Sequence, residues 1–346
     1  MTATVYPTKT VAALRQSRRG RYVWALLVLM ALSGACVLSV SFGTRTVGWN
    51  NILSGLSGRT DTMAEAVVAV RVPRTILAVI AGAALGVAGA VMQGVTRNPL
   101  ADPEILGVNA GAAMAVVIGI AWFGMSSLNG YLWTAILGAG IAACFVYAIG
   151  SLGRGGATPL KLALAGAATT IAATSFTVAI ILPRNDIAGG VRSWQIGGVG
   201  GASFDTIVPC LPFLAAGLAL CLLSARSLNL LALGEDAAAG LGARVAWARG
   251  AAALGAVLLC GATTAICGPI GFVGLVVPHF CRLLIGVDHR WLLPFSAMTG
   301  AILLVFADVA GRLVARPSEM DVGVVTAFIG APFFIWIVRR RRVREL

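Results

Sequence analysis

Residues 71–107 read RVPRTILAVIAGAALGVAGAVMQGVTRNPLADPEILG, and this stretch decides the fold. It begins with two arginines around Pro73, continues through uncharged residues rich in glycine and alanine, and ends in a polar segment with two prolines. A helix needs about 20 consecutive apolar residues to cross the hydrocarbon core of a bilayer. The stretch therefore predicts a transmembrane helix over about 72–95 that ends in a tight polar turn.

The composition extends this expectation to the whole chain. Only 11% of the 346 residues are charged and the mean hydropathy is +0.91, whereas a soluble domain has about a quarter of its residues charged. Apolar runs reach about twenty residues, whereas the strands of a membrane β-barrel alternate apolar and polar residues over about ten positions. A β-barrel is therefore excluded. We therefore predict an all-α polytopic membrane protein, with ten spans over about 22–42, 72–95, 105–123, 131–150, 161–182, 206–227, 246–266, 270–285, 292–312 and 321–338.

These spans form one transmembrane domain over residues 22–338, between basic segments at 1–21 and 339–346. The shorter apolar segments near 186–197 and 230–243 are expected not to span. The first apolar run resembles a signal peptide, but Ser33 stands where a lipoprotein cleavage box has leucine, so we expect an uncleaved helix. The seven cysteines form no CxxC pair and are expected to be neither disulfides nor metal ligands.

Ten spans place both termini on one side of the membrane. With the termini in the cytoplasm, eighteen of the 26 Lys and Arg residues lie inside, as the positive-inside rule requires. The net charge of +13 then reflects topology and does not indicate a nucleic acid partner. The rule leaves eight basic residues outside, namely Arg45, Arg59, Arg71, Arg74, Arg184, Arg192, Arg312 and Arg316.

The two ends of the opening helix differ in chemistry. Arg71 and Arg74 lie at its outer mouth, and we expect Pro73 in the first helical turn, where its missing N–H is harmless. At the inner end Asp102 is placed to cap the next helix. Between them one face carries small residues at every fourth position, which favours close helix packing; these are Gly82, Gly86, Ala90 and Gly94.

Three of the outer arginines, Arg71, Arg74 and Arg312, stand at helix ends. Asp308 precedes Arg312 by four residues, which places the two on one helix face where they can pair. An anionic protein surface, an anionic ligand or simple anchoring at the membrane interface would each explain these arginines.

A short helix is predicted in the cytoplasmic segment at 230–243. Gly234 breaks the chain, Glu235 and Asp236 suit the first turn of a helix, and small residues follow. Such a helix can dock a soluble partner or serve as a structured linker.

Residues 267–279 interrupt apolar sequence with glycines and prolines, as in the broken helices of transporters. His279, the last residue of this segment, suits a packing or hydrogen-bonding role better than metal ligation. His289 follows Asp288 in a cytoplasmic turn, where we expect it to be solvated.

Five blocks together resemble the permease subunits of type II ABC importers, the FecCD family, which imports ferric siderophores, haem and vitamin B12. The resemblance covers nearly the whole chain. It rests on RVPRT at 71–75, GAVMQGVTRNPLADPEILG at 89–107, ALGEDAAAGLG at 232–242, GPIGFVGLVVPH at 268–279 and VGVVTAFIGAPFFIWIV at 322–338.

The resemblance implies the type II importer permease fold and a set of partners. It implies two permeases, either two copies or two related chains, in the inner membrane of a bacterium, with an extracytoplasmic binding protein outside and an ATPase dimer inside. The chain has no GxxxxGK[ST] motif, so ATP and Mg²⁺ are expected on the partner ATPase, and no cofactor or metal is expected on this chain.

The resemblance also implies roles for single residues. It assigns docking of the binding protein to Arg71, Arg74 and Arg312, and the cytoplasmic gate to Asn98 and Leu100. It assigns coupling to the ATPase to Gly234, Glu235 and Asp236. The fifth span, about 161–182, is expected to line the path. The segment at 183–195 does not follow the family pattern. Its Arg184, Arg192 and Trp194 are candidates for a substrate mouth or for interfacial anchors.

A ferric siderophore importer is the function expected first, and it has several alternatives. The same machine can carry haem or vitamin B12. An ion-coupled secondary transporter normally needs acidic or histidine residues deep in the bundle, and Asp308 is the one acidic candidate, with Arg312 placed to neutralise it. A membrane enzyme or haem electron carrier is disfavoured, because the sequence has two histidines and no HExxH or GxSxG motif.

Overall fold

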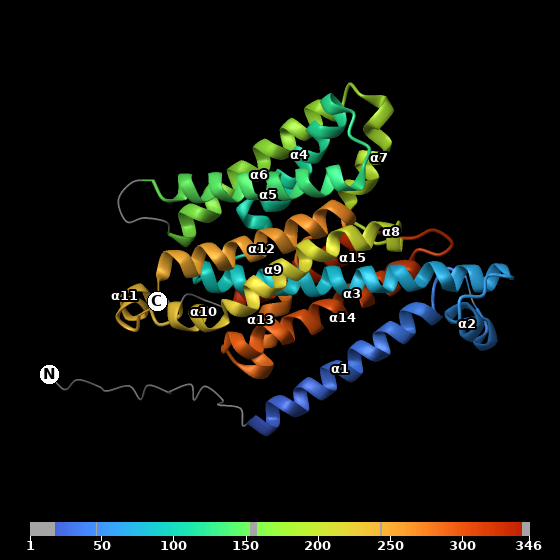
Figure 1. Ribbon diagram of the computed structural model, residues 1–346, viewed down its shortest axis with the longest axis horizontal. Coiled ribbons are helices and arrows are strands. Elements are labelled where there is room, and N and C mark those ends of the chain that lie inside the picture. Colours follow the sequence, from blue (N-terminus) through green and yellow to red (C-terminus); the bar gives the residue numbers. More distant parts are fainter. Residues whose placement is uncertain (1–17, 46, 153–157, 243, 341–346) are drawn as a thin grey trace.

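The computed structural model describes residues 18–45, 47–152, 158–242 and 244–340. Every regular element over these residues is a helix (Figure 1). In chain order the elements are α1 (Arg18–Ser41), α2 (Trp49–Leu56), α3 (Met63–Thr96), η1 (Glu104–Leu106), α4 (Val108–Phe123), α5 (Leu128–Gly150), α6 (Pro159–Ile181), α7 (Asn185–Ile196), α8 (Phe204–Ile207), η2 (Val208–Cys210), α9 (Leu211–Leu223), α10 (Ala225–Leu231), α11 (Glu235–Gly240), α12 (Val245–Cys267), α13 (Val273–Ile285), α14 (His289–Val314) and α15 (Val322–Arg340).

Ten apolar segments correspond to the ten predicted spans. Seven are long and apolar enough to cross a membrane, and three shorter apolar helices, within α4, α13 and α15, complete the set among the described residues. This confirms the all-α polytopic fold. The segments predicted not to span contain the short helices α7 and α11.

The long helices run along the longest axis of the molecule (Figure 1). Helices α2, α7 and α8 gather at one end, and α10 and α11 at the other, where α1 begins and α15 ends. We call these the outer and inner ends, after the predicted topology; that the inner end faces the cytoplasm stays a prediction. The basic segments predicted at 1–21 and 339–346 lie mostly outside the described residues.

Helix α3 is the central element and begins earlier than predicted. Thr62 accepts from the Glu65 amide and the Glu65 carboxylate accepts from the Thr62 amide, a capping box that starts the helix at Met63. Pro73 consequently lies inside the helix, so its predicted place in the first turn is wrong. Helices of membrane proteins tolerate such prolines because neighbouring groups satisfy the freed carbonyls.

The small-residue face of α3 was predicted to pack closely on a neighbouring helix, and that helix is α14. A side chain on Gly82 would overlap the Gly300 carbonyl, and one on Gly86 would overlap the Ser296 carbonyl. Nearer the inner end, a Cβ on Gly94 would lie 2.7 Å from His289 Nε2. The two helices therefore touch backbone to backbone, which only residues without large side chains permit.

A break separates α12 from α13. Gly268 and Phe272 both adopt positive φ, 70° and 66°, so α13 begins at Val273 and not at about 270 as predicted. Thirteen residues give α13 a length of about 20 Å, too short to cross the full hydrocarbon core. Interrupted backbone at this depth is tolerated because it is buried in protein, here against α3 and α15.

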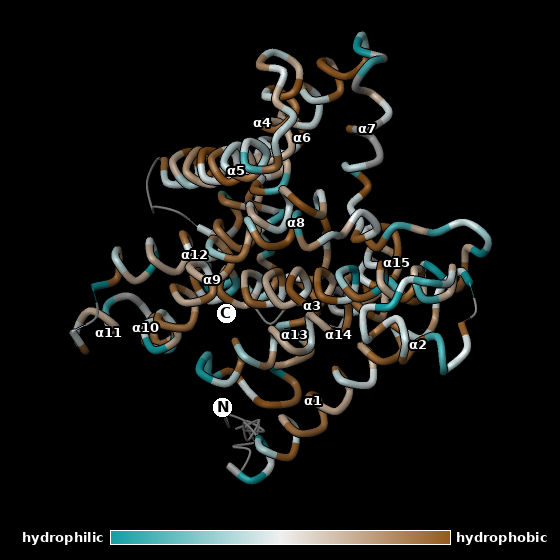
Figure 2. Tube along the Cα trace, turned by 45° about the vertical axis from the view of Figure 1, so that its right-hand side comes forward, coloured by the Kyte–Doolittle hydropathy of each residue, from teal (hydrophilic) through white to brown (hydrophobic). Residues whose placement is uncertain are grey.

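Hydrophobic residues recur along the peripheral helices, α1 and α5 among them (Figure 2). Met30 on α1 and Leu137 and Ile141 on α5 are each more than half exposed. A protein in water rarely exposes apolar surface of this extent, whereas lipid tails or a second membrane subunit would cover it.

Candidate functional site

Arg71 on α3 is enclosed by the linker between α1 and α2. Its guanidinium donates to the carbonyls of Val40 and Ser41, each at 3.0 Å, and to that of Arg45 at 2.7 Å. Gly43 lies against the guanidinium, where a Cβ would come within 2.7 Å of Cζ. Arg71 therefore holds the linker in place with a side chain that is almost fully buried.

Asp308 on α14 lies between two arginines and is fully buried. Its carboxylate is 2.7 Å from Arg74 and 2.8 Å from Arg312, which confirms the predicted pair at four-residue spacing. Arg312 also donates to the Ser39 carbonyl at 3.1 Å. Arg74 continues to the surface, where it meets Glu319 at 2.6 Å.

These residues form the outer arginine cluster, defined as Arg71, Arg74 and Arg312 around Asp308. The cluster ties α1, α3 and α14 together. The sequence placed all three arginines at the surface, but Arg71 and Arg312 are only 5% and 2% exposed because the chain around residues 39–45 folds over them. Arg74 is the member that reaches the surface, and the docking role stays a prediction.

The inner turn after α3 is built by local hydrogen bonds. Arg97 ends α3 in the left-handed region, at φ 52°. The Asn98 side chain accepts from the Leu100 amide at 3.0 Å, which closes an Asx turn. Asp102 accepts from the Glu104 amide at 3.1 Å, which closes a second Asx turn. The prediction that Asp102 caps the next helix is wrong, because Pro103 holds the N-cap position of η1 and Gly107 that of α4.

Asp102 is buried in the inner turn, beside the start of α13. A Cβ on Gly274 would lie 3.2 Å from its carboxylate. Burial, reinforced by the charge of Glu104, raises the pKa of Asp102 to about 7. Next to it Gln93 donates to the Gly274 carbonyl at 3.1 Å and accepts from Arg282. Sequence reasoning did not identify Gln93 or Arg282 as members of one network.

The predicted short helix at the inner end is present as α11. Gly234 precedes it with φ 108°, a conformation that favours glycine, and its carbonyl accepts from the Ala238 amide at 3.0 Å. Ala238 is fully buried, and α11 packs against α10 and α12. Asp236 is exposed, whereas the side chain of Glu235 lies outside the description. The geometry suits a docking helix, and its coupling role stays a prediction.

His289 is buried, so the expectation of a solvated histidine is wrong. Its backbone N–H donates to Asn229 Oδ1 at 2.9 Å, and its Nδ1 lies 2.8 Å from the same oxygen. Asn229 in turn donates to Asp288 at 2.7 Å. A signal was present in the sequence: positions 289, 292, 293, 296 and 300 follow helical periodicity and lie on the buried face of α14.

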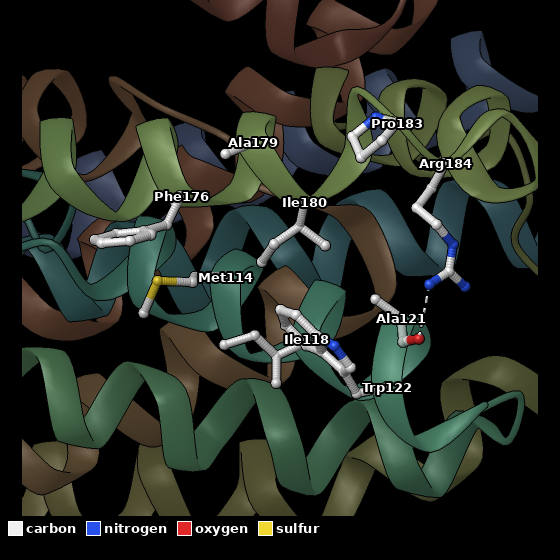
Figure 3. A pocket seen from close by; sticks show the side chains of 9 residues that line it. All are labelled: Met114, Ile118, Ala121, Trp122, Phe176, Ala179, Ile180, Pro183 and Arg184. Atoms are coloured by element: carbon white, nitrogen blue, oxygen red, sulfur yellow. Dashed lines mark hydrogen bonds between the residues drawn. The ribbon is translucent and has the colours of Figure 1, made fainter.

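A pocket of about 490 Å³ opens between α4 and α6 at the outer end (Figure 3). Arg184 lies at its rim and donates to the Ala121 carbonyl in the last turn of α4 at 3.1 Å. Arg184 also pairs with Asp186 at 3.3 Å. The lining is mostly apolar and consists of Met114, Ile118, Ala121, Trp122, Phe176, Ala179, Ile180, Pro183 and Arg184.

The other two residues of the predicted mouth are not brought to this pocket. Arg184 precedes the first turn of α7 and Trp194 lies in its last turn, so about 15 Å of helix separates them. Trp194 packs instead near the break at Gly268. The side chain of Arg192, also in α7, lies outside the description.

His279 and the cysteines take structural places. The His279 ring packs edge-on against Phe333, with ring centroids 5.9 Å apart. All seven cysteines are free. Within the described part of the chain, no group of three or more His, Cys, Asp or Glu side chains is arranged to hold a metal ion.

Ten apolar segments, an interrupted helix and polar clusters at both ends define a polytopic membrane protein of the transporter class. The chain belongs to the FecCD transport family, whose model matches residues 28–340. This confirms the family resemblance read from the sequence.

Named relatives cover nearly the full length. The ferric enterobactin transport system permease FepD of Escherichia coli is 44% identical over 91% of this chain and 94% of its own. The iron(3+)-hydroxamate import system permease FhuB of Bacillus subtilis is 43% identical over 91% of this chain and 84% of its own. A solved ABC transporter of the metal-chelate type, in an inward-facing conformation, matches with TM-score 0.77 and 26% identity over 92% of this chain and 99% of its own.

Proposed function

We propose that this chain is the permease subunit of an ATP-driven importer in the inner membrane of a bacterium. It moves a ferric siderophore from an extracytoplasmic binding protein to the cytoplasm. The observation that carries this proposal is the near full-length similarity, at 43–44% identity, to two permeases named for iron chelates. Since the sequence lacks a phosphate-binding GxxxxGK[ST] loop, ATP and Mg²⁺ bind a separate ATPase dimer.

The outer arginine cluster marks the face that receives the binding protein. Arg74 provides the direct contact, because its guanidinium shares its charge between buried Asp308 and the half-exposed Glu319. Arg71 and Arg312 fix the linker and helix ends that shape this face. Acidic residues on a binding protein would replace Glu319 as the partner of Arg74. Such charge pairs determine the orientation of docking and the association rate more than the affinity.

Charge reversal at Arg74 tests the docking face. In the reconstituted complex, Arg74→Glu should reduce the ATPase stimulation by the binding protein by about tenfold or more. Arg59→Glu, an exposed arginine at the same end, is the matched control and should reduce stimulation far less. Unchanged stimulation in a folded Arg74→Glu complex would contradict the docking assignment.

At the inner end, α11 docks into the ATPase and the Asn98–Leu100 turn belongs to the cytoplasmic gate. Gly234, Glu235 and Asp236 begin the docking helix, and the buried Ala238 anchors it to the rest of the chain. A helix held this firmly can transmit rigid-body motion of a partner to the bundle. The gate residues lie in a hydrogen-bonded turn at the end of α3, which can move as a unit.

A bulky residue at Gly234 tests the coupling assignment. Gly234→Val forces a branched side chain into φ 108°, so α11 should be misplaced and ATP hydrolysis should no longer drive uptake. Gly250→Val on α12 is the matched exchange at an exposed glycine with open space around it. Normal assembly and transport by Gly234→Val would show that α11 does not couple.

A second permease, either a copy of this chain or a related one, covers the exposed face of α6. This face mixes Thr174 and Ser175 with Ile171, all of them exposed. Hydroxyl groups beside apolar ones suit a substrate path better than a lipid contact. Arg184, at the rim of the neighbouring pocket, is placed to attract anionic groups of a chelate at the outer mouth.

A further inference from the structure

One group of hydrogen bonds between helices at the inner end has no role in the function proposed above. It centres on Asn229. This residue lies in α10, five positions before Gly234. Its amide nitrogen donates to Asp288 at 2.7 Å, and its amide oxygen accepts from the His289 backbone at 2.9 Å. The same oxygen lies 2.8 Å from His289 Nδ1. One side chain thus ties α10 to the first turn of α14 by three contacts.

His289 extends this connection to α3. Its Nε2 faces Gly94, where a Cβ would lie 2.7 Å from Nε2 and 3.3 Å from Leu228 of α10. Gly94 also accepts from the Arg97 amide at 3.4 Å, the bond that ends α3. The turn with Asn98 and Leu100 follows at once. A continuous set of contacts therefore runs from α11 through α10 and His289 to the inner turn.

Asp288 holds the middle of this set. Its carboxylate accepts from Asn229 and also from the Arg290 amide at 3.0 Å, so it caps α14 while it binds α10. Hydrogen bonds to a charged group are about twice as strong as neutral ones. The joint between α10 and α14 is thus directional and resists sliding, as apolar packing alone would not.

We propose that the Asn229–Asp288–His289 joint transmits motion of α11 to the inner turn, and that Asn229 is its positioning residue. The inference rests on the proposed function. When the ATPases move α11, α10 moves with it, and the joint carries α14 and the end of α3 along. Without the joint α10 would slide over α14, and ATP hydrolysis would continue with little effect on the gate.

A swap of the two partners tests the joint. Asn229→Asp removes the donor to Asp288 and sets two carboxylates together, and Asp288→Asn removes the charge. The double exchange Asn229→Asp/Asp288→Asn restores a donor and an acceptor between the two side chains in reversed order. One Asp288 oxygen accepts from both Asn229 and the Arg290 amide, so the asparagine introduced at 288 must rotate to donate with its nitrogen and to cap α14 with its oxygen. Asn129→Asp, at an exposed position in the first turn of α5 at the opposite end, is the matched control.

The readout is the amount of ferric siderophore taken up per ATP hydrolysed, in liposomes with the ATPase and the loaded binding protein. Each single exchange should lower this ratio by about tenfold, the loss expected for one hydrogen bond to a charged group. Hydrolysis itself should persist. The double exchange should restore the ratio to within about twofold of wild type, which a merely structural loss would not show.

Each result decides the question. Single exchanges that keep the wild-type ratio contradict the joint, as does a double exchange that assembles without regaining it. If the double exchange does not assemble, the single exchanges decide: a lowered ratio in both Asn229→Asp and Asp288→Asn supports the joint, and a wild-type ratio in either contradicts it. If the wild-type complex shows no ATP-dependent uptake, the proposed function fails instead, so the two failures are distinguishable.

Discussion

At the scale of single residues, Asp308 organises the outer end. It is fully buried and neutralises Arg74 and Arg312, each within 3 Å. Removal of one partner from a buried ion pair is strongly destabilising because it leaves the other charge uncompensated. The carboxylate therefore compensates part of the charge of two arginines that are mostly withdrawn from solvent.

Asp308→Asn should destabilise the protein by about 3–5 kcal/mol and lower the Tm measured in detergent. Glu319→Gln removes the partner of Arg74 that is 42% exposed, so it should cost less than about 1 kcal/mol. The two exchanges remove a negative charge from the same cluster at different depths. Equal effects on Tm would contradict the assignment of Asp308 as the central anion.

Asp102 gives the protein a pH dependence of defined sign. Burial raises its pKa from 3.8 to about 7, so between these values the folded protein binds more protons than the unfolded protein. Stability from this group is therefore present at low pH and is lost as pH rises toward 7. Asp102→Asn keeps an acceptor for the Glu104 amide and removes the titration.

The Tm of Asp102→Asn should exceed that of wild type at pH 8 by at least roughly 2 °C, and the difference should shrink toward pH 5. Thermal unfolding in detergent across this range measures it. A difference that grows as the pH falls would mean that Asp102 is stabilised in its ionised form.

His289 was predicted to be solvated, and its local sequence explains why that prediction was wrong. A histidine after aspartate at a helix start is often solvated, and the residues on either side carry charge. Burial arises because α10 folds back over this turn and supplies Asn229. These two hydrogen bonds join residues that are separated by 59 and 60 positions in the chain, so no local sequence pattern predicts them.

At the scale of elements, the contact between α3 and α14 was readable from the sequence as a face, though not as a pair of helices. The glycines at 82, 86 and 94 predicted a close approach, and the structure supplies the partners Gly300, Ser296 and His289. Helix ends were less readable. The capping box at Thr62 was present in the sequence, but Pro73 suggested a later start.

Gly82→Ala should destabilise the α3–α14 crossing by about 1–3 kcal/mol, because its Cβ would overlap the backbone of Gly300. Gly34→Ala on α1 is the control, since no atom lies within 4 Å of its Cβ. The Tm of the control should equal or slightly exceed that of wild type. A Tm for Gly82→Ala at the wild-type level would mean that the two helices can separate freely.

At the scale of the whole molecule, composition and apolar runs predicted the number of spans and the helical class. The arrangement of the ten passes, and the folding of the chain around residues 39–45 over Arg71 and Arg312, depend on contacts across the chain and were not readable from local pattern. The same holds for the short α2 at the outer end. The family blocks nevertheless identified both ends at which polar residues gather.

The molecule thus has two specialised ends joined by α3. Arg74 lies near its outer end, and the inner turn with Asn98 and Leu100 follows its last residue. Close contact with α14 along the small-residue face makes the pair a rigid unit between them. A movement at one end can therefore be transmitted to the other end without a large change in helix shape.

The central claim is that a separate ATPase drives iron-chelate import through this chain. Its most direct test is uptake of a radiolabelled ferric siderophore into liposomes that contain the permease, its ATPase and the loaded binding protein. We predict uptake that requires ATP inside, stops with a hydrolysis-deficient ATPase, and exceeds uptake of haem or vitamin B12 offered with the same binding protein. Uptake driven by an ion gradient without ATP, or preference for haem or vitamin B12, would contradict the account.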